Sequence, residues 1–363
     1  MPLETLTNRS AEPAEPQRRP LLRRRFIFLI LFGIASLVTG SLVLLRPGGE
    51  EPRPHTEGAP SSESYTVPAA IASDCSRDVS GELTRFLESV PNATAPHVNT
   101  VIFSEGGCYL VSEAVRLENR EGLVLVGQNA RLRRDEAPPS DSNRRRKAIL
   151  FVGSSRRITV RDLTIVGDND QPDNKDPGNY YDFDVDREHE HALLIYGDDK
   201  RGGPSSEILV SNLKTDQVFG DSIRLWGVHD VRIEKSTIYG AGRQGIAARG
   251  TDRLAIVDNV FDYLRRTAID FEEDPVTNVR IEGNHFESHN FNLGNFSGAL
   301  GPDKNILIEN NTANPDVRKS VRCTEETTGV VLRDNQPEFT DKPIGGNTNG
   351  CPSDGFDESR LPR

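Results

Sequence analysis

A repeat runs through most of the chain and restricts the folds that it can adopt. Nine-residue segments align without gaps from residue 157 onward: RITVRDLTI, EILVSNLKT, DVRIEKSTI, RLAIVDNVF, NVRIEGNHF and NILIENNTA. Equivalent positions are separated by 23, 23, 25 and 27 residues, at Val210, Ile233, Ile256, Ile281 and Ile308. A period of this length indicates a solenoid, in which each unit buries its apolar face only against its neighbours.

The composition of the repeat unit favours strands. Ile, Val and Leu alternate with polar residues, which is typical of strands with one buried face. A unit has no room for a helix, and the Leu/Asn consensus of a leucine-rich repeat, whose period is similar, is absent. We therefore predict an all-β fold, a right-handed parallel β-helix solenoid. Asn259, Asn284 and Asn311 share one repeat position, which predicts a stacked asparagine ladder closing a turn.

A short helix is predicted before the first coil. SGELTRFLESV places Leu83, Phe86, Leu87 and Val90 at helical spacing, with Ser80 as the N-cap, and strands follow in NTVIFSEGGCYLV and EGLVLVGQNARL. This order of capping helix, strands and coils resembles the pectin-lyase-like superfamily over residues 71–335. The resemblance implies a right-handed β-helix that cleaves, eliminates or epimerises acidic or neutral polysaccharides. It does not imply which reaction, because no complete catalytic signature of polygalacturonases or pectate lyases is present.

The N-terminal region predicts a membrane anchor. Residues 26–45 form an uncharged run of about 20 residues, enough to cross a ~30 Å hydrocarbon core, and arginines precede it at positions 18, 19, 23, 24 and 25. The alternative is a cleaved secretory signal, which has a shorter apolar run and a small-residue cleavage site. We expect a cytoplasmic tail over 1–25, a single transmembrane helix over 26–45, a flexible stalk over 46–70, an extracytoplasmic β-helix domain over 71–335 and an irregular C-terminal cap over 336–363.

The cysteines fit an extracytoplasmic domain. Cys75 and Cys108 bracket a segment near its start, and Cys323 and Cys351 bracket another near its end. Two local disulfides are the preferred pairing, with free buried thiols as the alternative. The chain has no C-x-x-C spacing, so a zinc or redox motif is not expected. The net charge of −11 argues against a nucleic-acid partner.

A second set of strands precedes the first in each unit: HALLIYG, DSIRLWG, QGIAARG and TAIDFEE. Positions such as Ile223 and Ile246 are apolar and point inward, so the intervening residues face outward. This outer face concentrates aromatic, arginine and amide side chains, which stack on sugar rings and bind hydroxyl or uronate groups. The predicted substrate-binding residues are His191, Tyr196, Arg224, Trp226, Arg243, Gln244 and Arg249.

Carboxylates on the same face are the candidate catalytic groups. Asp270 and Glu272 stand two residues apart on one strand, which predicts about 6.5–7 Å between them. Inverting glycosidases place their acid and base ~6.5–9.5 Å apart, leaving room for the attacking water. Asp221, two coils away from Asp270, is the helper or the alternative partner. These charges have a plain alternative role, which is to keep an exposed sheet soluble.

The insertion GDNDQPDNKDPGNYYDFDVDREHEH forms a candidate wall of the groove. Its alternating aspartates, Asp182, Asp184 and Asp186, are compatible with calcium binding. The glycine and terminal glutamate of an EF-hand loop are missing, however. The pair His189 and His191 is spaced for a transition metal, although exposed histidines in an acidic loop are more common. We predict no cofactor or metal, with calcium reserved for the case of a lyase.

These features predict a membrane-anchored extracytoplasmic protein that acts on a polysaccharide, as an inverting glycoside hydrolase. One alternative is a polysaccharide lyase or C5-epimerase on a uronic-acid polymer, with Arg224 or Arg249 as the base. The other is a non-catalytic glycan-binding or structural surface protein. The sequence leaves the choice of glycan open.

Overall fold

The computed structural model describes residues 62–134, 148–169, 187–197, 203–287, 292–297, 303–315, 317–324, 326–343 and 351–362. The predicted cytoplasmic tail, the predicted transmembrane helix and most of the predicted stalk lie outside these residues. No helix in the described part of the chain is long and apolar enough to cross a membrane. The fold described below belongs to the unit that begins at Thr56.

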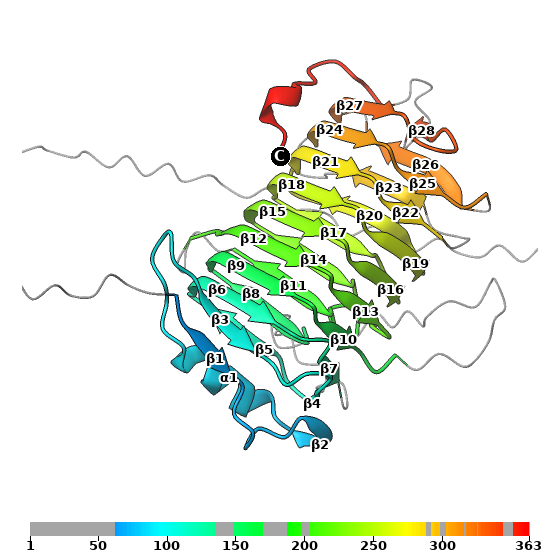
Figure 1. The fold of residues 1–363 in the computed structure, drawn as a ribbon. Helices are drawn as coiled ribbons and strands as arrows, with labels where there is room; N and C mark the ends of the chain where they lie inside the picture. Colours follow the sequence, from blue (N-terminus) through cyan, green and yellow to red (C-terminus); the bar gives the residue numbers. More distant parts are fainter. Residues whose placement is uncertain are drawn as a thin grey trace, which may run out of the picture. The chain divides into compact units, whose positions relative to one another are not determined.

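The strands stack into three parallel sheets around a common core, as Figure 1 shows. Sheet A contains β1 (Ser64–Thr66), β3 (Asn99–Ile102), β6 (Glu121–Val126), β9 (Arg156–Arg161), β12 (Ser205–Ser211), β15 (Val228–Glu234), β18 (Asp252–Val257), β21 (Thr277–Glu282), β24 (Lys304–Glu309) and β27 (Thr328–Arg333). Sheet B contains β2 (Asp74–Asp78), β4 (Cys108–Val111), β7 (Arg131–Arg134), β10 (Thr164–Val166), β13 (Lys214–Asp216), β16 (Thr237–Ala241), β19 (Val260–Leu264), β22 (His285–Phe286) and β25 (Thr312–Ala313).

Sheet C carries the predicted site. It contains β5 (Val115–Glu118), β8 (Leu150–Gly153), β11 (Leu193–Tyr196), β14 (Ile223–Trp226), β17 (Ile246–Arg249), β20 (Thr267–Glu272), β23 (Asn292–Ser297), β26 (Arg318–Cys323) and β28 (Thr340–Pro343). Each coil contributes one strand to each sheet in turn, so strands that are neighbours in a sheet come from successive repeats. The all-β solenoid predicted from the period is confirmed.

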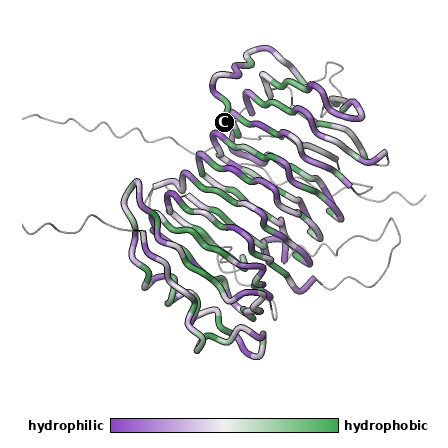
Figure 2. Tube along the Cα trace, in the orientation of Figure 1, coloured by the Kyte–Doolittle hydropathy of each residue, from purple (hydrophilic) through white to green (hydrophobic). Residues whose placement is uncertain are grey.

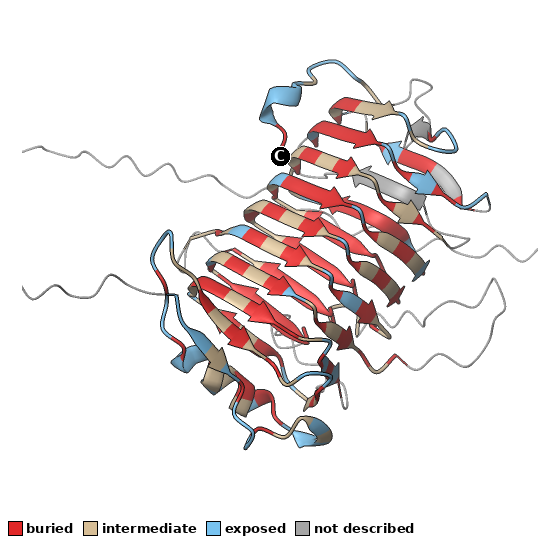
Figure 3. Ribbon diagram, viewed as in Figure 1, coloured by how far each residue is buried: buried red, intermediate tan, exposed pale blue. Residues whose placement is uncertain are grey.

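The predicted repeat register is also confirmed. Val210 lies beside Ile233, Ile233 beside Ile256, Ile256 beside Ile281, and Ile281 beside Ile308. These side chains are buried, and hydrophobic residues alternate with hydrophilic ones along the coils (Figure 2), so that buried positions run through all three sheets (Figure 3). Burial of the apolar stacks is the main force that holds one coil on the next.

The asparagine ladder forms as predicted and gains a member, Asn335. The Asn259 side-chain amide donates to Asn284 Oδ1 at 3.0 Å, Asn284 donates to Asn311, and Asn311 donates to Asn335. The side-chain oxygens of Asn284, Asn311 and Asn335 also accept the backbone N–H of the preceding member, and each amide nitrogen of the ladder donates to a backbone carbonyl. The ladder therefore satisfies the buried backbone groups at the turn.

The N-terminal cap differs in two details from the prediction. The helix α1 spans Ser80–Ser89 and buries Leu83 and Leu87, but Ser80 is its first residue and not its N-cap, which is Val79. The Ser80 hydroxyl instead accepts the N–H groups of Ser112 and Glu113 across 3.0 and 3.1 Å, which ties the helix to the first coil. The folded domain also begins before residue 71, because β1, in the predicted stalk, pairs with β3.

Both predicted disulfides, Cys75–Cys108 and Cys323–Cys351, are present. The C-terminal region is less irregular than expected, because β28 pairs with β26 and continues sheet C. The segment after Cys351 covers the end of sheet A, where the Val330 N–H donates to the Pro352 carbonyl at 2.8 Å. This contact satisfies part of the edge of β27, which limits edge-to-edge association.

Candidate functional site

Sheet C places the predicted site residues on neighbouring coils. Tyr196, Trp226 and Arg249 occupy equivalent positions on β11, β14 and β17. Arg224 and Asp270 share another position two coils apart, on β14 and β20. This is the arrangement that the sequence alignment predicted, because the alternation of strand residues sends both sets to the outer side of the sheet.

Much of this outer side is buried, although an open face was expected. Glu272 has a side chain that is 19 % exposed, whereas the other members of the cluster are between 0 and 8 % exposed. Long arginine side chains lie across neighbouring coils and cover the carboxylates, which removes both from water. We name the polar cluster by its members: His191, Asp221, Arg224, Arg243, Gln244, Asp270 and Glu272.

Glu272 lies at the centre of the polar cluster. Its carboxylate accepts a short hydrogen bond from Arg224, one of 2.9 Å from Arg243 Nη2 and one of 3.3 Å from Gln244 Nε2. Burial lowers the pKa of Arg224 and Arg243, but the charges of Asp221 and Glu272 outweigh burial and raise the pKa of both arginines above its usual value. Both guanidinium groups are therefore charged, and neither is a base.

Asp221 is fully buried and organises the other end of the cluster. Its Oδ2 lies 3.5 Å from Arg224 Nη1 and 3.7 Å from Arg243 Nη1, and its Oδ1 accepts the backbone N–H of Gln244 at 3.3 Å. With an exposed fraction of 0 %, Asp221 positions Arg224, Arg243 and Gln244. These contacts suit the predicted helper role, and the alternative catalytic role stays a prediction.

His191 is buried against Asp221 and is neutral. Its Nδ1 accepts the backbone N–H of Asp221 at 3.1 Å, which places the ring proton on Nε2. Burial lowers the pKa of His191 well below its usual range, and the charges of Arg224 and Arg243 lower it further. The 3.4 Å approach of Nδ1 to the Asp221 carboxylate is therefore not an ion pair.

Gln244 separates the two candidate catalytic carboxylates. Its Nε2 donates to Asp270 Oδ2 at 2.8 Å and to Glu272 Oε1 at 3.3 Å. The two contacted oxygens are no farther apart than these hydrogen bonds laid end to end. The inverting spacing of the two carboxyl groups stays a prediction, because these contacts fix one oxygen of each group and not the separation of the groups. Gln244 Oε1 and Arg243 Nε are buried without a hydrogen-bond partner among the described residues.

An aromatic row lies beside the polar cluster. The ring centres of Phe151 and Tyr196 are 6.4 Å apart, and those of Tyr196 and Trp226 are 5.5 Å apart in an edge-on arrangement. The guanidinium carbon of Arg249 lies 4.5 Å from the Trp226 ring centre. Arg249 is held in place by an ion pair with Glu273 and by a 2.6 Å contact between its Nε and Asp274.

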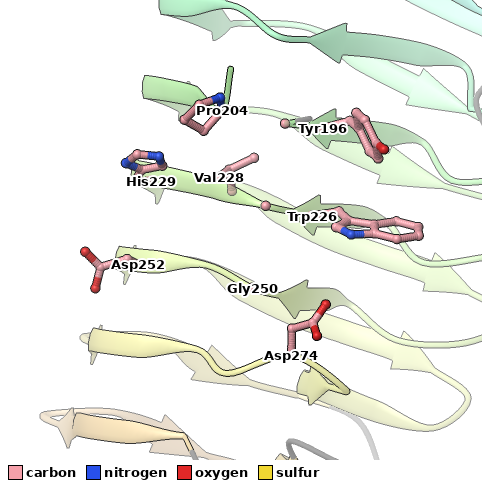
Figure 4. A pocket seen from close by; sticks show the side chains of 10 residues that line it. Tyr196, Pro204, Trp226, Val228, His229, Gly250, Asp252 and Asp274 are labelled. Atoms are coloured by element: carbon pink, nitrogen blue, oxygen red, sulfur yellow. The ribbon is translucent and has the colours of Figure 1, made fainter. Parts of the chain in front are cut away.

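A depression of about 530 Å³ opens where sheet C turns into sheet A (Figure 4). Tyr196 and Trp226 form one side and Asp274 lies beyond them, while His229 and Asp252 stand on the other side of the corner. The corner is narrow because it is made of glycine: a Cβ on Gly197 would lie only 2.0 Å from the carbonyl oxygen of Gly227. Because Gly197 has no side chain, successive coils can lie close together at this corner.

The sequence did not identify a partly buried salt-bridge group beside His191. Arg187 Nη2 contacts Asp168 and Glu190 at 2.6 and 2.7 Å, and its guanidinium carbon lies 3.5 Å from the Phe219 ring centre. Burial raises the pKa of Glu190, although Arg187 opposes this. Most of these residues lie in or beside the insertion, where the repeat gives no register. The only sequence signal there is the high content of charged residues.

The calcium and transition-metal hypotheses concern different parts of the chain. The acidic run 182, 184 and 186, for which calcium was considered, lies outside the described residues. His189 and His191 have ring centres 6.2 Å apart, and no group of three or more His, Cys, Asp or Glu in the described part of the chain is arranged to hold a metal ion.

Comparisons with known proteins agree with this architecture. Residues 221–342 match the family model of the right-handed β-helix region. A family 28 exopolygalacturonase from Yersinia enterocolitica is similar in structure, with a TM-score of 0.51 and 13 % identity over 80 % of this chain and 57 % of that one. The chain thus has the right-handed parallel β-helix fold. Its fold is the one that the resemblance to the pectin-lyase-like superfamily implied.

Other solved structures have lower similarity. An alginate lyase from Paenibacillus sp. has a TM-score of 0.46 and 11 % identity over 83 % of this chain and 99 % of that one. PfbA, a surface adhesin of Streptococcus pneumoniae, has a TM-score of 0.44 and 13 % identity over 77 % of this chain and 82 % of that one. A search among curated proteins found no matching sequence. At these identities the comparisons define the fold, and the reaction has to be argued from the site.

Proposed function

We propose that this protein is a glycoside hydrolase that acts on a polysaccharide at the outer side of sheet C. Asp270 is the proton donor to the leaving oxygen, and Glu272 is the second carboxylate. The observation that carries this proposal is the pair of carboxylates joined by Gln244, beside an aromatic row and a depression large enough for a sugar unit. Paired carboxylates next to aromatic side chains are what glycoside hydrolysis requires.

Because one oxygen of each carboxylate shares the Gln244 amide, we propose a retaining reaction, with the inverting reaction as the alternative. Retaining enzymes place their carboxyl groups ~5–5.5 Å apart, and the second one attacks the anomeric carbon. Glu272 suits that position, because it is the most exposed member of the polar cluster and Arg224 and Arg243 orient it. Gln244 would have to release one carboxylate when a sugar enters, since its amide now occupies the space between them.

A glycan-binding protein without turnover is the second candidate, and the charge pairing favours it. Glu272 already accepts from three donors, and Arg249 already binds Glu273 and Asp274. A network in which the charged groups satisfy one another is rigid, and rigidity helps to hold a ligand. It does not by itself supply a proton donor.

A lyase or epimerase has less support. Its base was to be Arg224 or Arg249, but Arg224 remains charged and Arg249 is paired with two carboxylates. A calcium-dependent elimination would instead require that residues outside the described part of the chain bind the cation. We also propose that residues 26–45 anchor the protein in a membrane with the β-helix outside the cytoplasm, on the basis of the apolar run and the arginines before it.

The test uses the full-length protein in a detergent without a sugar headgroup and a panel of neutral and uronic polysaccharides. New reducing ends, retention of anomeric configuration by NMR, and loss of about 10²-fold or more of activity in Asp270→Asn and Glu272→Gln support the proposal. The control is Glu282→Gln, which alters a similar Arg–Glu pair on sheet A. Unsaturated, chelator-sensitive products would instead identify a lyase, and saturable binding without products would identify a glycan-binding protein.

A further inference from the structure

We propose that the corner depression between sheets C and A is a subsite for an uncharged sugar ring, and that the protein therefore acts on a neutral or N-acetylated glycan and not on a polyuronate. This inference rests on the proposed function, and it specifies the chemical class of the substrate. Trp226 and Tyr196 form its apolar side, and Asp252 and Asp274 are its hydrogen-bond acceptors.

The charge of the depression carries the argument. Among the described residues, those that line it include Asp252 and Asp274 but no lysine or arginine. A uronate placed here would meet two carboxylates at short range, with the low-dielectric sheet behind them, and the repulsion would be screened only in part. Sugar hydroxyl groups, in contrast, donate readily to carboxylates, and such charge-assisted hydrogen bonds are stronger than neutral ones.

The arginines nearby do not reverse this charge. Arg224 and Arg243 both contact Asp221 and Glu272, and Arg249 is bound by Glu273 and Asp274. A uronate would have to displace a carboxylate of the protein from one of these arginines. Because the three arginines face more carboxylates than they neutralise, their neighbourhood on β14, β17 and β20 retains a negative charge that disfavours an acidic polymer.

Two structural details show how an uncharged sugar would be accommodated. Asp274 engages Arg249 through Oδ2, and Asp252 engages Thr277 and Asn278 through Oδ1, so each carboxylate has a second oxygen for which the described residues provide no hydrogen bond. A Cβ on Gly250 would meet nothing closer than the Asp274 Cβ at 3.5 Å, so the space over the corner is open. The Trp226 and Tyr196 rings provide the apolar contact that the C–H faces of a pyranose need.

Trp226 is the single tryptophan of the chain, so its fluorescence reports directly on the depression. Full-length protein is titrated with four uncharged hexasaccharides: cellohexaose, xylohexaose, mannohexaose and N-acetylchitohexaose. Parallel titrations use hexagalacturonate and hexamannuronate, and all are made at an ionic strength of about 0.15 M. We expect at least one uncharged hexasaccharide to change the Trp226 emission saturably, and no change from the uronates over the same concentrations.

Variants connect the signal to the depression. Asp274→Asn and Asp252→Asn should each weaken binding of the uncharged sugar about 10-fold, the effect of a lost charge-assisted hydrogen bond. Asp230→Asn is the matched control, since it removes a carboxylate from an Arg–Asp pair that does not line the depression, and it should leave affinity within about twofold. Thermal unfolding of each variant separates loss of binding from loss of folding.

The outcomes separate this inference from the proposed function. Saturable binding or cleavage of a uronate would overturn the inference and leave a carbohydrate-active protein. Cleavage of an uncharged sugar without any change in Trp226 emission, or with both aspartate variants unaffected, would also overturn it, because the substrate would then lie elsewhere on the sheet. If none of the six probes is bound or cleaved, the inference and the proposed function both fail.

Discussion

Two stacks of polar side chains in this molecule follow the same geometry and serve different ends. The asparagine ladder repeats one residue type over four coils, and its inner members Asn284 and Asn311 both donate and accept within the stack. The polar cluster on sheet C combines different residue types, and the described residues provide no hydrogen bond for its buried Gln244 Oε1 and Arg243 Nε. Identical residues in a stack satisfy one another, which is a structural use. A stack of different residues leaves some polar atoms for which the fold provides no hydrogen bond.

The comparison teaches how to distinguish structural from functional polar positions in a solenoid. Buried polar atoms without partners cost free energy, so they persist where something other than folding needs them. Substitutions in the ladder should therefore reduce stability, and substitutions in the polar cluster should alter ligand interactions more than stability. Three experiments test this contrast.

The largest expected effect on stability comes from the middle of the ladder. Asn284→Ala removes the acceptor of the Asn259 N–H, and it also leaves the Ile256 carbonyl without its donor. Two buried backbone groups lose their partners, so we expect the free energy of unfolding to fall by about 3 kcal/mol or more. Chemical denaturation measures this directly.

The control for this experiment is Asn335→Ala at the end of the same ladder. Asn335 is partly buried, so water can replace some of its hydrogen bonds, and its loss should cost less than half as much. Equal losses at the two positions would contradict the view that the ladder stabilises the fold by satisfying buried groups.

A smaller effect is expected from the ionisation of His191. Its folded-state pKa is depressed, so the unfolded chain binds a proton that the folded chain does not. The contribution to stability is therefore present above the unfolded pKa of about 6.5 and is lost as the pH falls below it, by at most about 1.4 kcal/mol per pH unit. In His191→Asn, which keeps an acceptor for the Asp221 N–H, this part of the pH dependence should disappear.

The partly exposed His229 provides the comparison for that measurement. His229→Asn should leave the pH dependence of unfolding between about pH 5 and 7 as it is in the unaltered protein, because His229 is only half-buried and lies outside the buried polar cluster that surrounds His191. A slope that survives in His191→Asn would show that another group, such as Glu190, causes it.

The smallest expected effect on stability comes from Gln244. Gln244→Met keeps the volume, loses two side-chain hydrogen bonds and removes the unpartnered Oε1 from the interior. These terms oppose each other, so we expect stability to change by about 1 kcal/mol or less. Sugar binding or cleavage should fall by more than about 10-fold, because Gln244 positions both Asp270 and Glu272. A large loss of stability with intact function would place Gln244 with the structural asparagines.

The sequence by itself determined the fold and which strand residues of the site lie on the outer side of sheet C. The period and the alternation of Val210 and Ile233 with polar residues require strands that stack coil on coil, and the same alternation assigns Trp226 and Arg249 to one row. The spacing of the cysteines was likewise enough to pair them correctly. These features depend on a regular backbone, and a regular backbone can be read from residue spacing.

Only the tertiary structure decided which of these side chains meet. Arg224 contacts Glu272 across two coils and 48 residues, and the Gln244 amide bridges Asp270 and Glu272. Successive coils lie ~4.8 Å apart, whereas an extended arginine side chain reaches farther than one such step. Its partner therefore depends on rotamers and on the burial of its neighbours, and the order of residues in a repeat contains neither.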